Sequence, residues 1–512
     1  MTTSWTLEDV DLVRLDIVAS RLALALKPSD AIALSGPLGA GKTTLARALV
    51  GRLGGEDEVP SPTFALMQRY ETPRLVVTHC DFYRLAPSEV GELGLDDALA
   101  EGVVLAEWPE RAASWLPEDR LDIAIDETAT PNMRRIVMTG HGSWTDRLAR
   151  LRAISEFLDK TPYADAGAHY LQGDASARSY ARLVLPHRSA ILMNSPRQPD
   201  GPPIRDGKPY SALVHLAEDV TPFVAIAGAL RESSLTAPAI YAFDLEQGFI
   251  ILEDLGDRVF GAEIAKDHNK GHKMAELWGA AVNALLAIAE APPPERLPIE
   301  GHAPYRLPGF DADAMLTEAS LLIDWFWPAL HGKPMPQALR DEFAALWRPL
   351  LAKAATSDSG WVLRDYHSPN LMWLPAREGV KRVGLLDFQD ALKGPLAYDL
   401  VSLLQDARLD VPEALEREQL ARYCAARNAQ SPHFSSDGFR TLYATLGAQR
   451  NSKILGIFAR LAKRDGKRGY LAHIPRVARY LERDLAHPAL ASLRGFYARE
   501  FPNAADLPKL AL

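Results

Sequence analysis

The chain has 512 residues, of which 47% are hydrophobic and 24% charged, the composition of a globular protein with more than one domain. Its net charge of -9 and pI near 5.9 argue against a protein that coats nucleic acid electrostatically. Cys80 and Cys424 form no Cys-x-x-Cys pair, so we expect neither a zinc site nor a disulfide framework. The acidic N-terminus lacks a signal-peptide core and no apolar run approaches a membrane span, so we expect a cytoplasmic protein that does not contact the membrane.

The first elements along the chain are a helix and a short buried strand. Residues 7–26 place apolar side chains at helical spacing and predict an amphipathic helix (Leu12, Leu15, Val18, Leu22 and Leu26). Pro28 and Asp30 are expected to end that helix. Residues 31–35 (AIALS) predict a strand.

A glycine-rich loop follows this strand. Residues 36–44 read GPLGAGKTT and lead into a second predicted helix, which is the strand–loop–helix order of a Walker A motif. Its glycines let backbone N–H groups surround phosphate oxygens, and the helix N-terminus adds its dipole. Lys42 is expected to reach the outer phosphates, and the Thr43 hydroxyl to bind Mg²⁺. The predicted nucleotide-binding residues are Gly36, Gly39, Gly41, Lys42, Thr43 and Thr44.

A P-loop also needs a carboxylate for the metal or the attacking water, and two strands offer one. Residues 75–80 run into Asp81, and residues 102–106 run into Glu107. Each acid stands at the carboxyl end of an apolar strand, where ligands bind in open α/β sheets. The alternative is that either acid caps the next element. Between the P-loop helix and these two strands, Ser61 and Thr63 belong either to a switch loop or to a simple turn. Strands at 121–125 and 135–139 complete the domain.

Four motifs occur in order within this first part of the chain: GPLGAGKTTLARAL, VPSPTFALMQRYE, HCDFYRL and VVLAEWPER. Together they resemble the TsaE (YjeE) family, the ATPase subunit of the bacterial tRNA threonylcarbamoyladenosine pathway. The resemblance implies that Mg·ATP binds through Lys42, Thr43, Asp81 and Glu107. It also implies partnership with the transferase TsaD and its companion TsaB. The family serves the modifying complex rather than reading tRNA itself, and direct contact with tRNA stays open.

The junction between the two parts lies near residue 143, after the turn-rich Gly140–Ser143. Thr145 is a candidate N-cap for a helix over residues 146–158. We therefore predict a P-loop ATPase domain at 1–143 and a second domain at 144–512.

The second domain opens with a candidate nucleotide loop within residues 171–183 (LQGDASARSYARL), where Ser176 and Arg178 could meet ATP phosphates; a plain hairpin is the alternative. A kinase carries its phosphate-pairing Lys on the next strand, and this chain has Met193 there. The strand at 249–255 ends in a hinge-like segment, in which Glu253 and Leu255 are the predicted adenine-contacting positions.

The stretch Trp361–Asp390 carries the groups that phosphoryl transfer requires. Asp365 and Asn370 are five residues apart, and Asp387 follows a short apolar strand at 383–386. In the protein-kinase layout the first Asp accepts the proton of the attacking hydroxyl, and the Asn and second Asp hold Mg²⁺. The pattern predicts Asp365 as the catalytic base and Asn370 and Asp387 as metal ligands. The alternative is a turn and a strand end that are acidic by coincidence.

Four further motifs extend this pattern: LEDLGD, RDYHSPNLMW, LLDFQDALKGPLAYDLVSLLQD and LGAQRNSKILGIFARL. Residues 160–505 resemble the aminoglycoside phosphotransferase/choline kinase group, and most closely its AmgK cell-wall sugar kinases. The resemblance implies an α/β P-loop domain followed by a two-lobed α+β protein-kinase-like domain. It implies ATP- and Mg²⁺-dependent phosphorylation of the anomeric hydroxyl of N-acetylmuramic acid and N-acetylglucosamine. It also implies that Asp399 braces the catalytic loop, and Leu363 replaces a His whose role in the wider family is mainly architectural.

Two alternatives compete with a fused sugar kinase and tRNA-pathway ATPase. One is a kinase of another small molecule, such as an aminoglycoside or a choline-like substrate. The other treats the N-terminal half as a nucleotide-dependent assembly switch with negligible turnover alone. Trp325, Trp327 and Trp347 are expected in the core rather than in a sugar pocket, and His367 contacts either substrate or backbone.

Overall fold

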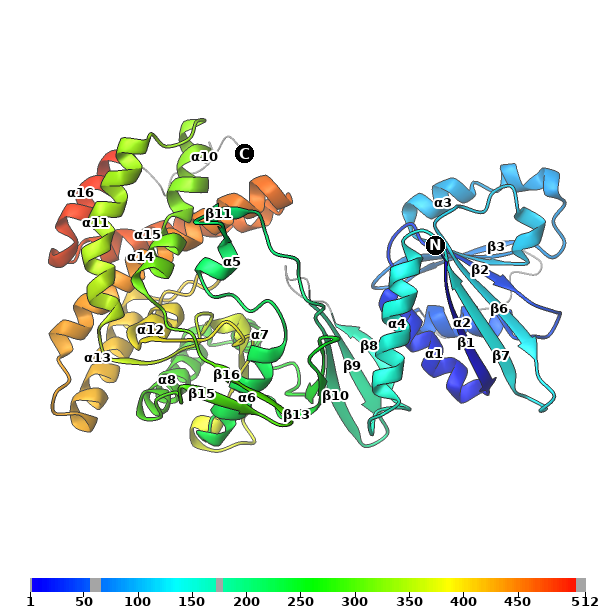
Figure 1. Cartoon of the computed structure of the whole chain (residues 1–512), viewed down its shortest axis with the longest axis horizontal. Helices are drawn as coiled ribbons and strands as arrows, with labels where there is room; N and C mark the ends of the chain where they lie inside the picture. The colour runs from blue at the N-terminus through cyan, green and yellow to red at the C-terminus, as the bar shows by residue number, and fades with distance from the viewer. Residues whose placement is uncertain (1, 56–65, 172–177, 503–512) are drawn as a thin grey trace. The chain divides into compact units, whose positions relative to one another are not determined.

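A computed structural model describes residues 2–55, 66–171 and 178–502, and the chain forms two compact units (Figure 1). The first unit comprises Met1–Pro196 and Tyr241–Asp254, and the second comprises Arg197–Ile240 and Leu255–Leu512. The predicted sequence-domain boundary at residue 143 lies inside the first unit and stays a prediction.

A seven-stranded sheet with the order β1-β7-β6-β2-β5-β4-β3 forms the N-terminal α/β domain. The central strand β2 (Ala31–Ser35) runs parallel to β5 (Val103–Glu107) and β6 (Leu121–Glu127), and β4 (Val76–Asp81) runs parallel to β5. Apolar residues of these strands pack with α2 (Lys42–Arg52) in one buried core. β3 (Met67–Glu71) and α3 (Leu95–Glu101) complete the domain together with β7 (Arg134–Gly140).

The first helix begins later than its apolar spacing predicts. Residues 3–10 form β1 (Thr3–Val10), which pairs antiparallel with β7, so the helix prediction is wrong for residues 7–10. Helix α1 (Leu12–Ala25) begins after Asp11 because the Asp11 carboxylate accepts a hydrogen bond from Arg14 N at 2.7 Å. Leu12 is 71% exposed, whereas the later apolar positions of the pattern are buried (Leu15, Val18, Leu22 and Leu26).

Helix α4 (Trp144–Leu158) belongs to two hydrophobic cores. Trp144 and Leu148 pack with the seven-stranded sheet, while Ile154 and Leu158 pack against a second sheet. This second sheet has the order β13-β14-β10-β9-β8, and Figure 1 shows α4 between the two sheets. The helix begins after Ser143, so the predicted N-cap Thr145 lies inside it. The strands of the second sheet are β8 (Gly167–Leu171), β9 (Ser179–Leu185), β10 (Arg188–Asn194), β13 (Ile240–Asp244) and β14 (Phe249–Glu253).

The second unit is mainly helical and carries the catalytic stretch on short strands. Two antiparallel pairs hold that stretch, β17 (Ser359–Val362) with β20 (Leu392–Pro395) and β18 (Leu371–Trp373) with β19 (Val383–Leu385). Helix α9 (Ala312–Ala319) is followed by a π-helical turn, Leu322–Phe326. The remaining helices are α5 (Tyr210–Leu213), α6 (Thr221–Glu232), α7 (Phe260–Lys266), α8 (Lys270–Glu290), α10 (Trp327–His331), α11 (Gln337–Ala355), α12 (Ala397–Leu404), α13 (Glu413–Gln430), α14 (Ser436–Asp465), α15 (Ile474–Leu485) and α16 (Ala491–Glu500). Two hairpins, β11 (Pro203–Arg205) with β12 (Lys208–Pro209) and β15 (Arg296–Ile299) with β16 (His302–Arg306), complete it.

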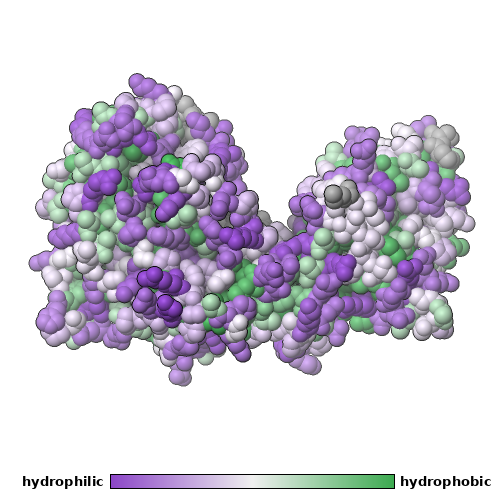
Figure 2. All heavy atoms as spheres, in the orientation of Figure 1, coloured by the Kyte–Doolittle hydropathy of each residue, from purple (hydrophilic) through white to green (hydrophobic). Residues whose placement is uncertain are grey.

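The tryptophans of the helical block pack as the sequence predicts. Trp327 and Trp347 are buried, and Trp325 is partly buried. The face drawn in Figure 2 is mainly hydrophilic over these helices, with small hydrophobic patches between polar residues. Within the described ranges, no helix combines the length and apolar character required to cross a bilayer.

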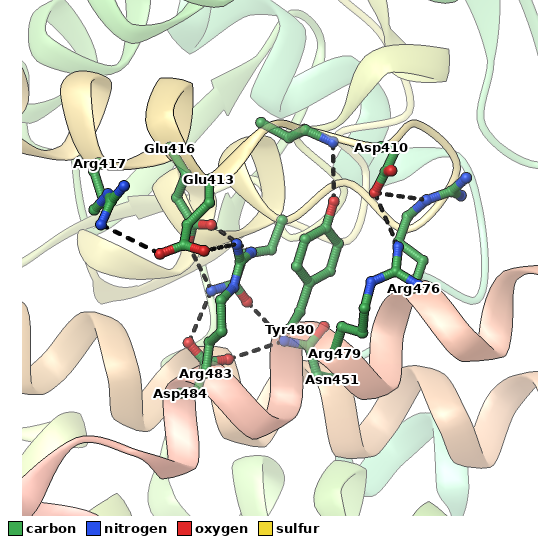
Figure 3. A network of polar contacts seen from close by, with 12 residues as sticks. Asp410, Glu413, Glu416, Arg417, Asn451, Arg476, Arg479, Tyr480, Arg483 and Asp484 are labelled. Carbon is green, nitrogen blue, oxygen red and sulfur yellow. Dashed lines mark hydrogen bonds and ion pairs between the residues drawn. The ribbon is translucent and has the colours of Figure 1, made fainter. Parts of the chain in front are cut away.

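Helices α13, α14 and α15 are joined by a buried polar network (Figure 3). Asn451 Nδ2 donates to Gln405 Oε1 at 2.7 Å and to Asp484 Oδ2 at 3.0 Å. Gln405 Nε2 donates in turn to Asp484 Oδ1 and to Glu416 Oε1. This network fixes the segment that follows α12, and the next residue of that segment, Asp406, reaches the catalytic loop.

Candidate functional site

The P-loop has the backbone that its glycines predict. Gly36, Gly39 and Gly41 all have positive φ, and α2 begins directly after Gly41. Gly36 is the most constrained, because a Cβ at this position would lie 2.2 Å from Ile125 O and its φ is +136°. Only glycine satisfies both conditions. The loop therefore brings Lys42, Thr43 and Thr44 to the first turn of α2.

Lys42 lies folded over its own loop. Its Nζ donates to Gly36 O at 2.8 Å and to Pro37 O at 2.9 Å, and it lies 3.8 Å from the centre of the Trp108 ring. Burial lowers the pKa of Lys42, and the nearby carboxylates of Glu107 and Asp81 oppose this shift. Within the described part of the chain, carbonyl oxygens and an aromatic face hold this ammonium and no carboxylate pairs with it directly, which suits a group that pairs with phosphate.

The two predicted carboxylates meet at the carboxyl edge of the sheet. In the parallel β4–β5 pair, Asp81 lies opposite Glu107, and both residues are buried. Asp81 Oδ1 accepts a hydrogen bond from Tyr83 N at 3.0 Å, so this carboxylate also fixes the turn after β4. Glu107 Oε1 lies 2.8 Å from Nε2 of the buried His79. Ser61 and Thr63 lie outside the described residues.

The catalytic loop of the second unit brings Asp365, Asn370 and Asp387 together. Asn370 Nδ2 donates to Asp365 O at 3.0 Å, which closes the loop on itself. Leu386 N donates to Asn370 O at 2.9 Å, so the residue before Asp387 is tied to Asn370. Asp387 has φ +56°, a left-handed conformation that a non-glycine residue keeps only when its surroundings impose it.

The Asp365 carboxyl group lies in a positively charged environment. Burial by itself raises the pKa of this carboxyl, but the positive charges of Lys453, Arg450 and Arg364 oppose it, and the net pKa is lowered. The side chain remains 41% exposed. Asp365 is therefore ionised near neutral pH and accessible, as a group that accepts a proton from substrate must be.

Asp399 holds the backbone of the catalytic loop. Its carboxylate accepts hydrogen bonds from Leu363 N at 2.6 Å and from Arg364 N at 3.0 Å. Arg364 has φ +69°, so the loop turns sharply just before Asp365. Asp399 thus has the bracing contacts that the sequence predicts.

His367 faces buried groups rather than open solvent. Its Nε2 lies 3.4 Å from Asn370 Nδ2 and 4.0 Å from Asp365 Oδ1. Burial lowers its pKa, against the opposing charges of Asp406 and Asp365, so the ring is neutral near pH 7. Asp406 also accepts a hydrogen bond from Ser368 N at 2.8 Å. These contacts favour a role in shaping the loop.

A buried ionic cluster behind the loop has no counterpart in the predicted site. Glu318 is fully buried and accepts hydrogen bonds from Arg364, from Lys453 at 2.8 Å and from Gln449 at 3.2 Å. Arg364 also donates to Val214 O at 2.9 Å. The sequence signal was present, because Gln449 and Lys453 interrupt the apolar pattern of a long helix at helical spacing.

The other predicted nucleotide-contacting residues are divided between the units. Arg178, which directly precedes β9, and Glu253 of β14 belong to the first unit, together with the buried Met193. Leu255 belongs to the second unit, and Ser176 lies outside the described residues. The nucleotide contacts of these residues stay a prediction.

Both parts of the chain match known families. Residues 11–136 match the family described as threonylcarbamoyl adenosine biosynthesis protein TsaE, and residues 168–434 match the phosphotransferase enzyme family.

Individual relatives cover the same two parts. An N-acetylmuramate/N-acetylglucosamine kinase of Caulobacter vibrioides is 39% identical over 362 residues, covering 69% of this chain and 97% of the relative. The enzyme of the same name from Pseudomonas aeruginosa is 34% identical over 342 residues, 65% of this chain and 88% of that protein. A tRNA threonylcarbamoyladenosine biosynthesis protein TsaE of Rickettsia bellii is 41% identical over 107 residues, 20% of this chain and 74% of the relative. The chain is thus a fusion that belongs to the TsaE family through its N-terminal P-loop domain and to the phosphotransferase enzyme family through its protein-kinase-like domain.

Proposed function

We propose that the C-terminal domain transfers the γ-phosphoryl group of ATP to the anomeric hydroxyl of N-acetylmuramic acid or N-acetylglucosamine. The observation that carries this proposal is the loop in which Asn370 donates a hydrogen bond to Asp365 O and accepts one from Leu386 N, the residue before Asp387. The similarity to sugar kinases over nearly the whole length of the Caulobacter relative supports the substrate class.

In this proposal Asp365 orients the sugar hydroxyl and accepts its proton as the oxygen attacks phosphorus. A hemiacetal hydroxyl is more acidic than an ordinary alcohol, so a carboxylate of lowered pKa is an adequate base. The sugar oxygen forms its bond to the γ-phosphorus, and the bond to the bridging oxygen breaks to release ADP.

The donor set of the loop fits Mg²⁺. The Asn370 amide nitrogen is engaged by Asp365 O, which leaves the amide oxygen as a ligand, and Asp387 supplies a carboxylate. Oxygen donors of this type are the ones Mg²⁺ prefers. When bound, the ion would neutralise the negative charge that develops on the phosphates.

The charge around Asp365 favours a neutral or anionic sugar over a polycationic aminoglycoside. Lys453, Arg450 and Arg364 all act on the Asp365 carboxyl, and two of them share the single carboxylate of Glu318. A polycation would be repelled by these groups, whereas the carboxylate of N-acetylmuramic acid would be attracted.

A substrate panel tests this proposal. Purified full-length protein is incubated with labelled ATP and N-acetylmuramic acid, N-acetylglucosamine, an aminoglycoside or choline, with Asp365→Asn as the matched control. We expect phosphate on the anomeric oxygen of the amino sugars, identified by phosphorus–proton couplings. Phosphorylation of the aminoglycoside or choline alone would contradict the proposal.

For the N-terminal domain we propose a P-loop ATPase that serves tRNA threonylcarbamoyladenosine formation with TsaD- and TsaB-like partners. Gly36, Gly39, Gly41 and Lys42 would hold the phosphates, and the Thr43 hydroxyl with Asp81 and Glu107 would serve the metal and water. Gly39 and Gly41 have positive φ and open space where a Cβ would stand, which fits a loop whose backbone approaches a phosphate closely. ATP hydrolysis measured with and without the partners tests this role, and stimulation by the partners is the expected result. Equal negligible turnover in both conditions would favour an assembly switch.

A further inference from the structure

His79 is a fully buried histidine that lies two residues before Asp81 on β4. Its side chain is inaccessible to solvent, and its Nε2 lies 2.8 Å from Glu107 Oε1. Glu107 is also buried, with 3% of its side chain exposed. The pair joins two neighbouring strands directly beneath the P-loop edge of the sheet.

The hydrogen bond to Glu107 defines how His79 is held. A carboxylate can only accept, so the imidazole proton lies on Nε2 and points to Glu107. Among the described residues, the buried Nδ1 atom has no hydrogen-bond partner. A buried acceptor without a donor costs free energy, so packing alone does not account for a histidine here. In the described ranges, the polar contact of this ring is the one with Glu107.

The two carboxylates at this edge are therefore supported differently. Asp81 is fixed through its own strand end, by the backbone N–H of Tyr83. Glu107 has a longer side chain, and the contact that orients its carboxylate comes from His79. The bond engages Oε1, and no described residue donates a hydrogen bond to Oε2. The charge of this carboxylate acts on Lys42.

We propose that His79 is a positioning residue that holds Glu107 as the water-orienting carboxylate of the P-loop site, while Asp81 serves the metal. In the hydrolysis step, Oε2 of Glu107 accepts a hydrogen bond from the attacking water. The water oxygen forms its bond to the γ-phosphorus, the bridging oxygen leaves on ADP, and the water proton is released with phosphate. This inference rests on the proposed ATPase function of the N-terminal domain.

The test uses the full chain in an Asp365→Asn background, which silences the kinase, with the TsaD- and TsaB-like partners present. His79→Leu removes the donor, and His79→Gln keeps an N–H donor of comparable reach. We expect the single-turnover hydrolysis rate to fall about 10–100-fold in His79→Leu, the usual effect of removing a group that orients a site carboxylate, and to recover to within a few-fold in His79→Gln. Binding of a fluorescent ADP analogue, in EDTA and in Mg²⁺, should change less than about two-fold, since Glu107 then acts on water rather than on nucleotide or metal.

The chain offers a control in His141, the residue directly after β7, whose Nε2 lies 2.8 Å from Asp122 Oδ2 on the neighbouring strand β6. His141→Leu removes a similar pair away from the P-loop and should leave hydrolysis unchanged. The double variant His79→Leu/Glu107→Gln should hydrolyse ATP as slowly as Glu107→Gln alone. His79 acts only through Glu107 in this proposal, so the two losses should not multiply.

Three results would overturn the proposal: a fall in ADP-analogue affinity as large as the fall in rate, a His79→Gln protein no more active than His79→Leu, or losses that multiply in the double variant. If His79→Leu does not fold, His79→Asn replaces it, because its shorter amide cannot reach Glu107 and should show the same loss. Absence of hydrolysis in the parent protein with partners would instead refute the ATPase function itself, and this inference with it.

Discussion

At the scale of single residues, the kinase chemistry depends on two acids with different surroundings. Asp365 is exposed beside positive charge, while Asp387 is held in a left-handed conformation at a strand end. We assign the role of base to Asp365 and the role of metal ligand to Asp387, and substitutions of the two residues can distinguish these roles.

Asp365→Asn keeps the shape of the side chain and removes the base. We expect kcat for sugar phosphorylation to fall by about 10²–10⁴-fold with little change in the KM for ATP. Asp387→Asn should instead weaken the metal–nucleotide complex and be partly rescued by more Mg²⁺ or by Mn²⁺. Steady-state kinetics at several metal concentrations measure both. Metal rescue of the Asp365 variant rather than the Asp387 variant would reverse the assignment.

Asp399 gives the catalytic loop a pH-dependent stability. Burial raises the pKa of this carboxyl to about 7, although the N–H groups of Leu363 and Arg364 oppose the shift. A pKa above the unfolded value means that the folded state holds the proton more tightly. The stability from this group is therefore present below about pH 4 and is lost as the pH rises towards about 7.

We expect the free energy of unfolding of the wild type to fall between pH 5 and pH 8 by on the order of 2 kcal/mol more than that of Asp399→Asn. The variant has no titrating group at this position. Urea denaturation of both proteins at the two pH values measures the difference. An identical pH dependence in the two proteins would show that the Asp399 carboxyl does not titrate in this range.

At the scale of elements, α4 is the piece of structure that the two cores share. Its first half packs against the seven-stranded sheet and its last turns against the β8–β10 sheet. Polar contacts join the same parts: Arg21 of α1 pairs with Asp159 directly after α4, and Ser20 Oγ accepts a hydrogen bond from Ala168 N of β8 at 3.0 Å. Because one helix is buried in both cores, we expect that destabilising one core also destabilises the other.

Ile154→Ala tests this shared role. Loss of a buried isoleucine is expected to cost about 2–5 kcal/mol, and amide hydrogen exchange should rise in β1 and β7 as well as in β8–β10. Arg152→Ala is the control on the same helix, because its ion pair with Glu156 is half-exposed and worth well under about 1 kcal/mol. Faster exchange confined to β8–β10 would mean that the two cores unfold independently.

At the scale of the whole molecule, the chain carries two sites built from unrelated motifs. The P-loop site lies entirely in the first unit, and Asp365, Asn370 and Asp387 lie in the second. We therefore expect the two cores of the first unit to depend on each other for stability through α4. The activities of the two sites should be independent of each other.

Lys42→Ala should abolish nucleotide-dependent function of the N-terminal domain and leave sugar phosphorylation unchanged. Among the described residues, the ammonium contacts its own loop and Trp108, and none of these groups belongs to the catalytic loop. Parallel assays of ADP-analogue binding and sugar kinase rate, with circular dichroism to verify folding, measure both effects. A tenfold loss of kinase rate in the folded variant would reveal communication between the sites.

The parts of each site that lie close together along the chain could be predicted from the amino-acid sequence. Residues 36–44 form a P-loop because the glycine conformations and the start of α2 are set within the loop itself. Asp365 and Asn370 meet for a similar reason, since one short turn closes between them. Both family resemblances depend on motifs of this kind, which consist of consecutive residues and can be recognised in the sequence without the fold.

The distant side chains that support those groups could not be predicted, because their contacts depend on how separate strands and helices pack. His79 meets Glu107 because β4 and β5 lie parallel in one register, and Glu318 meets Arg364 and Lys453 because three separate elements pack together. β1 was missed because an edge strand gains its hydrogen bonds from β7, which lies far along the chain, and its own apolar spacing resembled that of a helix. The dual burial of α4 was likewise hidden, because a helical pattern shows which positions are apolar but not which core each one enters.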